Sequence, residues 1–324
     1  MTFTRLIFRR TIQAIPLFFG ILLTNFLIIH LAPGDPASFL AGAEASPGYI
    51  EALRAQWGLD KPVLEQFVLY IAKVLHGDLG YSFAQSRPVI EVVLERVPNT
   101  LLLMSVSFTI AVLLGITFGV ISSRRPYGVV DSIVSIGSLV VYSLPEFWIG
   151  IVLVLTLGLY LNLFPVQGMI TPGLISPISR TVDLLWHLVL PATVLGLAQL
   201  AMFSRQTRAN MLEVIGEDYI VTARCKGCDE RTVLYKHALR NAMLPVVTTI
   251  GLRVQTLFTG AVVVEEVFAW PGTGRLLFAA IHSRDYTLLM GIFIIVSVLV
   301  IVGNILADIA YALVDPRVRY TKES

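Results

Sequence analysis

The sequence predicts an all-α protein that crosses a membrane several times. Of its 324 residues, 56% are hydrophobic and only 14% are charged, whereas a soluble domain carries about 25% charged residues. Apolar runs of about 20 residues, the length that crosses a hydrocarbon layer of ~30 Å, recur along the chain. The net charge of +2 gives no support to nucleic-acid binding. We therefore expect six transmembrane helices, near residues 12–32, 100–122, 129–164, 188–204, 243–264 and 287–307.

The first run follows Arg5, Arg9 and Arg10, as a secretory signal would. At about 20 residues it is longer than the apolar part of a signal peptide, so we interpret it as an uncleaved anchor. Residues 1–32 are assigned to a cytoplasmic amino terminus and the first transmembrane helix.

Residues 33–98 form a sizeable segment outside the membrane. Within it, "PVLEQFVLYIAKVLHGD" has apolar residues at helical spacing. The stretch is too short and too polar to span, so we expect it to lie on the membrane surface or to cap the mouth of the helix bundle. The predicted apolar face consists of Leu64, Phe67, Val68, Ile71, Val74 and Leu75.

The third run has an unusual length. Its 36 residues would make a helix of about 54 Å, which is longer than one crossing and too short for three. Pro145 in "SLPEFW" removes a backbone donor and clashes with the preceding turn. We therefore expect one crossing that is kinked there.

Basic residues are distributed unevenly between the two sides of this arrangement. With the amino terminus inside, fifteen Lys and Arg residues face the cytoplasm and eight face outward. An excess of basic residues marks cytoplasmic loops. Both termini are thus expected in the cytoplasm, with a transmembrane core at 99–312, a cytoplasmic loop at 205–243 and a tail at 313–324.

The charged stretch from Glu217 to Pro245 lies between two apolar runs. Gly227 suits the left-handed residue that ends a helix, and Asp229 is placed to cap the next one. The stretch therefore predicts helix, glycine turn and helix, either docking a partner or covering the bundle as a solvated loop. The expected apolar stripe is Met211, Leu212, Ile215, Tyr219, Thr222 and Ala223, and Leu234, Ala238 and Ala242 share a face of the second helix.

Cys225 and Cys228 form the sequence C-K-G-C, which occurs in redox pairs and in half zinc sites. Zinc needs four ligands, and His237 has no second histidine or cysteine beside it. The two cysteines are therefore interpreted as small apolar residues, and no metal site is expected.

Ionisable residues inside spans are costly and are therefore candidates for a translocation path. Arg253, with Gln255, could bind a carboxylate or pair with a neighbouring helix. Glu146, beside Pro145, could bind a cation or satisfy freed backbone groups, and the second role is favoured. Glu265, Glu266 and Asp308 are interpreted as residues of interfaces between helices.

The whole chain resembles permease subunits of binding-protein-dependent ABC importers. Their cytoplasmic motif, E-A-A-x-x-x-G followed by L-P, corresponds to Val221-Thr222-Ala223, Gly227 and Leu244-Pro245, although the glutamate and first alanine are absent. "TARCKG" and "HALRNAMLPV" are similar to the dipeptide, oligopeptide and nickel branch. So are "LAPGDPA", "GLDKPVLEQF", "HGDLGYSF", "RVPNTLLL", "SLPEFW", "GAVVVEEVFAWPGTGRLL", "RDY" and "NILADIAYALVDPRVRY", in the same order.

The resemblance implies the type I ABC importer permease fold in a bacterial inner membrane, working by alternating access. It implies four kinds of partner: a second permease, one or two ATPase subunits that hold ATP and magnesium, an extracytoplasmic binding protein, and a peptide, nickel or other small solute. It also implies that the residues coupling the chain to the ATPase are Glu217, Asp218, Tyr219, Thr222, Ala223, Arg224, Gly227 and Arg231.

The chain lacks the phosphate-binding loop G-x-x-x-x-G-K-[ST], so no nucleotide site, bound cofactor or catalytic residue is expected on it. An intramembrane enzyme is disfavoured because the histidines are scattered and no H-E-x-x-H occurs. An ion-coupled carrier is disfavoured because it would need more buried carboxylates and would leave the cytoplasmic stretch without a role.

Overall fold

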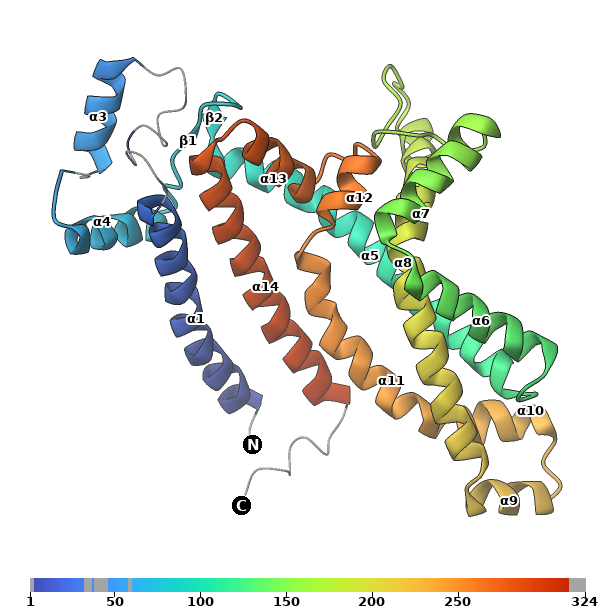
Figure 1. Cartoon of the computed structure of the whole chain (residues 1–324). Coiled ribbons are helices and arrows are strands. Elements are labelled where there is room, and N and C mark those ends of the chain that lie inside the picture. Colours follow the sequence, from blue (N-terminus) through green and yellow to red (C-terminus); the bar gives the residue numbers. More distant parts are fainter. Residues whose placement is uncertain (1–2, 32–36, 38–45, 58–59, 315–324) are drawn as a thin grey trace. The chain divides into compact units, whose positions relative to one another are not determined.

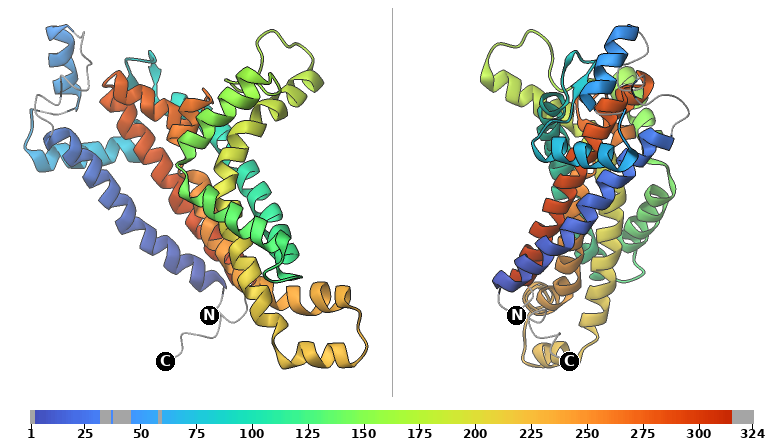
Figure 2. Two further views of the ribbon diagram at one scale, coloured as in Figure 1. Left: turned by 45° about the vertical axis from the view of Figure 1, so that its right-hand side comes forward. Right: turned by 90° about the vertical axis from the view of Figure 1, so that its left-hand side faces the viewer.

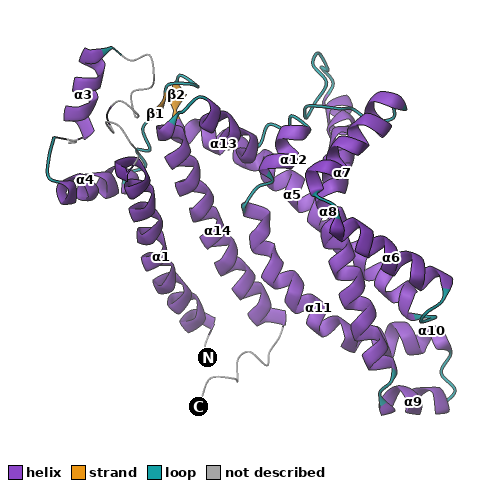
Figure 3. Ribbon diagram, in the orientation of Figure 1, coloured by secondary structure: helices purple, strands orange, loops and turns teal. Residues whose placement is uncertain are grey.

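A computed structural model describes residues 3–31, 37, 46–57 and 60–314, which are almost entirely helical (Figures 1 and 3). The chain divides into two compact units. The first unit comprises the chain up to Leu101, Phe258–Val262 and the chain from Pro271 onward. The second comprises Leu102–Leu257 and Val263–Trp270. The predicted boundary at residue 32 and most of the tail 313–324 lie outside the described residues.

The first unit holds two long helices that lie side by side. In α1 and α14, Leu22 and Phe26 pack against Ile294, and Arg10 Nε lies 2.9 Å from an oxygen of Asp308. This ion pair explains the intramembrane Asp308 as a contact between helices. The elements of this unit are α1 (Phe3–Leu31), α3 (Pro47–Trp57), α4 (Val63–Leu75), β1 (Tyr81–Ser82), β2 (Arg87–Pro88), the start of α5 (Val89–Ser123), α13 (Thr273–His282) and α14 (Tyr286–Val314).

The two short strands form a hairpin at the start of α5. They pair antiparallel, with Tyr81 opposite Pro88 and Ser82 opposite Arg87. The helix that follows begins at Val89, about ten residues before the predicted span, and continues through Pro98. A proline inside a helix normally costs stability, but here tertiary packing outweighs that cost. The added turns bury Val89, Val92, Val93 and Val97 against Leu276, Ala280, Leu288 and Ile292.

The second unit holds the remaining helices. It contains the rest of α5, then α6 (Val129–Ser143), α7 (Glu146–Leu153), the π-helix η1 (Val154–Tyr160), α8 (Pro177–Ile215), α9 (Asp218–Cys225), α10 (Glu230–Thr232), the π-helix η2 (Val233–Ala238), α11 (Leu239–Arg253), most of the 3₁₀-helix η3 (Val254–Phe258) and most of α12 (Val262–Val267).

Four helices of the described chain are long and apolar enough to cross a membrane. They lie in α1, α5, α8 and α14. The pair formed by α6 and α7–η1 counts as a fifth span if both parts cross together, and it bends by 104°. The bend falls between Ser143 and Glu146, which confirms the break predicted at Pro145.

The predicted fifth crossing at 243–264 is divided in the structure. α11 has 15 residues and continues directly into the 5 residues of η3. At about 1.5 Å and 2.0 Å per residue the two extend roughly 32 Å, close to the thickness of the hydrocarbon layer. The helical path begins at Leu239, before the predicted start of the span, and ends at Phe258, before its predicted end. Gly260 then turns the chain with φ +77°.

Candidate functional site: the helix-turn-helix around Gly227

The charged stretch folds as a helix-turn-helix that continues from α8 and leads into α11 (Figure 1). α8 ends at Ile215, Gly216 caps it, and α9 begins after Glu217. Because the helix stops and restarts, the predicted stripe is shifted. Tyr219 and Thr222 are exposed, and Ile220, which was not predicted, is fully buried.

The inner side of this region is an apolar cluster. Burying a side chain such as that of Ile220 contributes about 1.5–3 kcal/mol to stability, so the helix-turn-helix is held firmly against its own unit. Leu234, Ala238 and Ala242 are buried together, as predicted. The cluster consists of Val120, Met211, Ile220, Ala223, Val233, Leu234, Ala238 and Ala242.

Ala223 has a different position from the one expected. It was expected to allow close approach of a partner, but its side chain is only 7% exposed and packs inside the apolar cluster. Its small size allows α9 to lie close to its own chain. The outward face of α9 is formed by the exposed residues Asp218, Tyr219, Val221, Thr222, Arg224 and Cys225.

The turn after α9 has the predicted geometry. Gly227 has φ +82°, and a Cβ placed on it would have no atom within 4 Å. The glycine is therefore needed for its backbone conformation, and the space around it is open. Asp229 caps the next helix by accepting a hydrogen bond from the Thr232 N–H at 3.3 Å. Hydrogen bonds from Thr232 also lower the pKa of Asp229.

Two polar contacts brace the helix-turn-helix. Arg224 Nη2 donates to Glu230 Oε1 at 2.9 Å across the turn, and this hydrogen bond raises the pKa of Arg224. Arg224, one of the expected coupling residues, stays 41% exposed in this pair, so its coupling role remains a prediction. Asn241 Nδ2 donates to Tyr219 Oη at 2.7 Å and links α9 to α11. Glu217 occupies the N-cap position of α9, and its side chain makes no capping hydrogen bond. Arg231 is exposed on α10.

The loop between α5 and α6 also contacts this region. Arg124 donates to Tyr235 Oη and lies 5.3 Å from the centre of its ring. Beyond the loop, Asp131 accepts two hydrogen bonds from Arg208 of α8, one of them 2.6 Å long from Nη2. The distance of 77 residues between Asp131 and Arg208 hid this pair from sequence reasoning. Through these contacts, α6, α8 and η2 are mechanically linked.

The two cysteines have no metal-binding surroundings in the structure. Cys225 is exposed, and Cys228 is half-buried against the apolar cluster. Among the described residues, no group of three or more His, Cys, Asp or Glu side chains is placed to hold a metal ion.

The three residues expected in a translocation path lie at breaks in helices. Arg253 ends α11, with its Nη2 3.4 Å from Met202 Sδ, and Gln255 follows in η3. Glu146 opens α7 at the 104° bend. Within the described chain, no hydrogen bond or ion pair joins Glu146 to Arg253 or Gln255.

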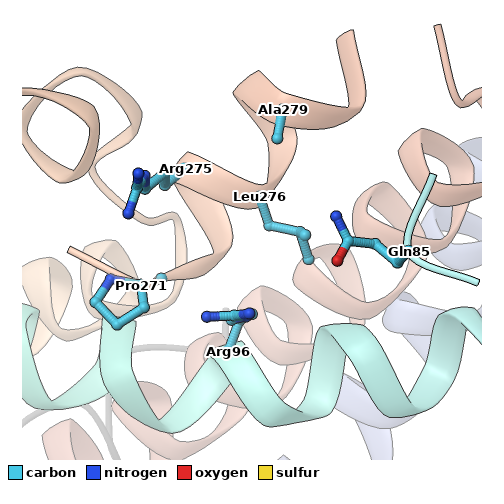
Figure 4. A pocket seen from close by; sticks show the side chains of 7 residues that line it. Gln85, Arg96, Pro271, Arg275, Leu276 and Ala279 are labelled. Atoms are coloured by element: carbon cyan, nitrogen blue, oxygen red, sulfur yellow. The ribbon is translucent and has the colours of Figure 1, made fainter. Parts of the chain in front are cut away.

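A pocket of about 190 Å³ lies between α5 and α13 in the first unit, and sequence reasoning missed it. Arg96 of α5 and Arg275 of α13 both line it (Figure 4). Asn99 Nδ2 donates to the Pro271 carbonyl at 2.8 Å and holds the two helices together beside it. The other lining residues are Gln85, Pro271, Gly272, Leu276 and Ala279.

Two family models together match nearly the whole chain. Residues 97–320 match "Binding-protein-dependent transport system inner membrane component", and residues 3–104 match the N-terminal part of such membrane components. The chain belongs to this family of ABC importer permeases. The fold predicted for it, a polytopic all-helical membrane protein, is therefore confirmed.

Individual relatives agree with this assignment. The chain is 42% identical over 315 residues to an oligopeptide transport system permease protein of Bacillus subtilis strain 168, covering 97% of this chain and 99% of the relative. It is 40% identical over 335 residues to a dipeptide transport system permease protein of Escherichia coli K12, covering 98% and 99%. A putative peptide transport system permease protein of Brucella abortus strain 2308 is 41% identical over 317 residues, covering 98% and 99%.

Proposed function

We propose that this permease forms the translocation path for di- and oligopeptides that an extracytoplasmic binding protein delivers. The names of its relatives from Bacillus, Escherichia and Brucella, each a peptide permease, support this substrate class. The same architecture importing nickel or another small solute is the alternative. The membrane is a bacterial inner membrane, and both termini lie in the cytoplasm.

The helix-turn-helix around Gly227 is the site at which a separate ATPase drives transport. The observation that carries this proposal is its construction: an inner face locked by the apolar cluster, and an outer face of exposed polar residues around an open glycine turn. A rigid element of this kind transmits a displacement to the helices attached to it, here α8 and α11. ATP and magnesium are held by the ATPase, and a second permease completes the path.

The mechanism is alternating access. Closure of the ATPase subunits displaces the helix-turn-helix, and α8 and α11 move with it because they are its continuation in the chain. Gln206 Nε2 of α8 donates to Thr249 Oγ1 of α11 at 2.8 Å and links the two helices. Asp131 and Arg208 extend the movement to α6. Two-state movements of packed helices of this type open a cavity to one side and then to the other. Arg253, Gln255 and Glu146 sit at helix breaks, where such a path needs polar groups.

The test compares two substitutions at Gly227. Valine at a positive φ is strained by about 1–3 kcal/mol, whereas asparagine tolerates that conformation. We expect Gly227→Val to lower peptide-stimulated ATP hydrolysis by the assembled complex at least about tenfold, the equivalent of ~1.4 kcal/mol. Gly227→Asn keeps the turn but adds a side chain. The loss of peptide-stimulated ATP hydrolysis in this variant therefore measures how closely the ATPase approaches the turn.

Gly173 provides the matched control. It has φ +90° and no atom within 4 Å of an added Cβ, but it lies in the loop before α8, which the charge distribution assigns to the outer side. Gly173→Val should insert equally well and retain stimulation. If Gly227→Val hydrolyses ATP with unchanged stimulation, the helix-turn-helix is not the coupling element.

A further inference from the structure

Helix α4 leaves a row of apolar side chains uncovered in the first unit. Leu64, Val68 and Leu75 are 81%, 64% and 62% exposed. At 100° per residue these three lie within about 40° of one another on the helix surface. Neighbouring positions on the adjacent face, Phe67, Ile71 and Val74, are covered by α1 and α14. The sequence predicted one apolar face, and the structure divides it into a covered half and an open half.

The contacts of α4 fix its depth along the membrane-spanning helices. Its residues Phe67 and Tyr70 contact Phe26 of α1, with ring centres 5.1 and 6.1 Å apart. Gln66 Oε1 lies 2.7 Å from His30 Nε2. The apolar span of α1 ends at Ile28, and Phe26, which both rings contact, lies two residues earlier. Two residues correspond to about 3 Å of helix, so α4 meets α1 close to the end of the span.

The residues of α14 in the same cluster also lie near the end of its span. Met290 and Ile294 belong to the cluster with α4, and α14 begins at Tyr286. They therefore lie about 6 and 12 Å along the helix from its start. Helices that bind the surface of a bilayer bury their apolar face about 5–10 Å below the headgroups. The contacts with α1 and the cluster shared with α14 place α4 near that level.

The direction of α4 fits this position. It runs across one end of α1 in every view (Figures 1 and 2). Because α1 crosses the bilayer, a helix crosswise to it lies close to the membrane plane. Exposed Glu65 lies about 140° around α4 from buried Tyr70.

We propose that α4 is an interfacial anchor whose open row, Leu64, Val68 and Leu75, inserts into the outer leaflet of the lipid bilayer. A lipid surface fits better than a protein partner because the row is a single line of three side chains, whereas a stable protein interface buries about 800 Å² on each partner. Next to it, α1 is itself sparsely covered, because only 17% of the apolar part of its span is buried. Leu27, Ile28 and Leu31 of α1 are exposed at the same level.

The test places a nitroxide spin label on α4 of the assembled complex in lipid nanodiscs. Single cysteines replace Leu64, Val68 or Leu75, and Glu65→Cys is the matched control on the polar side; Cys225 and Cys228 are replaced by serine. Collision rates are measured with oxygen, which concentrates in lipid, and with a water-soluble nickel chelate. We expect the ratio of oxygen to nickel collisions to be several-fold higher at Val68→Cys than at Glu65→Cys.

Two results would overturn the proposal. Low collision rates with both reagents at the three apolar positions would mean that another protein subunit covers the row. A dominant nickel rate would mean that the row faces water. A second variant guards against misfolding: Val68→Asp in the Leu75→Cys protein should lower the oxygen-to-nickel ratio at position 75, whereas Glu65→Asp should leave it unchanged.

Discussion

Asp285 illustrates how a single carboxylate joins the β1–β2 hairpin to α13 and α14 in the first unit. It is fully buried between α13 and α14. Ser82 Oγ and the Ala84 N–H donate to its Oδ2 at 2.6 and 3.2 Å, and the Leu288 N–H donates to its Oδ1 at 2.9 Å. The hairpin is thereby tied to the start of α14. The sequence marked "RDY" only as part of a resemblance, because Ser82 lies 203 residues away.

We predict that Asp285→Ala destabilises the protein by about 2–5 kcal/mol, because it leaves several buried donors without acceptors. Asp285→Asn should cost less, since it keeps one acceptor oxygen. The measurement is thermal unfolding of the complex in detergent. Asp78→Ala is the control, because exposed Asp78 accepts one hydrogen bond from the Gly80 N–H; equal losses for Asp285→Ala and Asp78→Ala would contradict the assignment.

At the scale of helices, α5 and α8 approach each other through glycine. A Cβ on Gly115 would lie 2.7 Å from Phe203 Cβ, and one on Gly119 would lie 2.5 Å from Thr207 Cβ. These glycines form a G-x-x-x-G pattern, which lets membrane helices pack backbone against backbone. The pattern is visible in the sequence, but it does not reveal which helix is the partner.

We predict that Gly119→Val destabilises the second unit, because an added side chain would overlap Thr207 and the Ser204 carbonyl. Overpacking of this kind costs about 1–3 kcal/mol. Gly137→Val on α6 is the matched control, since a Cβ there has no atom within 4 Å. Thermal unfolding of both variants tests the idea, and a Gly119→Val protein as stable as Gly137→Val would refute close packing at this point.

At the scale of the whole molecule, sidedness follows from charge. The basic residues of the helix-turn-helix and of the loop at Arg124 and Arg125 should face the cytoplasm. Cys225 offers a natural reporter, because it is exposed on α9.

We expect a membrane-impermeant maleimide to label Cys225 in inverted membrane vesicles and not in right-side-out vesicles. Mass spectrometry of the modified peptide measures the labelling, and Cys225→Ser removes the signal. Ser86→Cys, on the exposed hairpin turn, should show the opposite sidedness when both native cysteines are replaced by serine. Labelling of Cys225 from the outside would reverse the proposed orientation.

The local features of the helix-turn-helix were predictable from sequence. Gly227 as a left-handed turn, Asp229 as a cap and the shared face of Leu234, Ala238 and Ala242 each depend on neighbours within a few residues. The stripe on α9 was wrong because helical spacing was continued across Gly216. Where one helix ends and another begins, the spacing of apolar residues in the first helix does not predict which face of the second is buried.

The sequence by itself determined the membrane class, the permease family, the break at Pro145 and the glycine turn at Gly227, because these depend on composition, motifs and local spacing. Only the tertiary structure decided that Ala223 faces inward, that Arg224 pairs with Glu230, that Asp131 pairs with Arg208 and that α4 keeps an uncovered apolar row. Each of these depends on which distant segments pack together, and packing energies between segments far apart along the chain leave no periodic signal in the sequence.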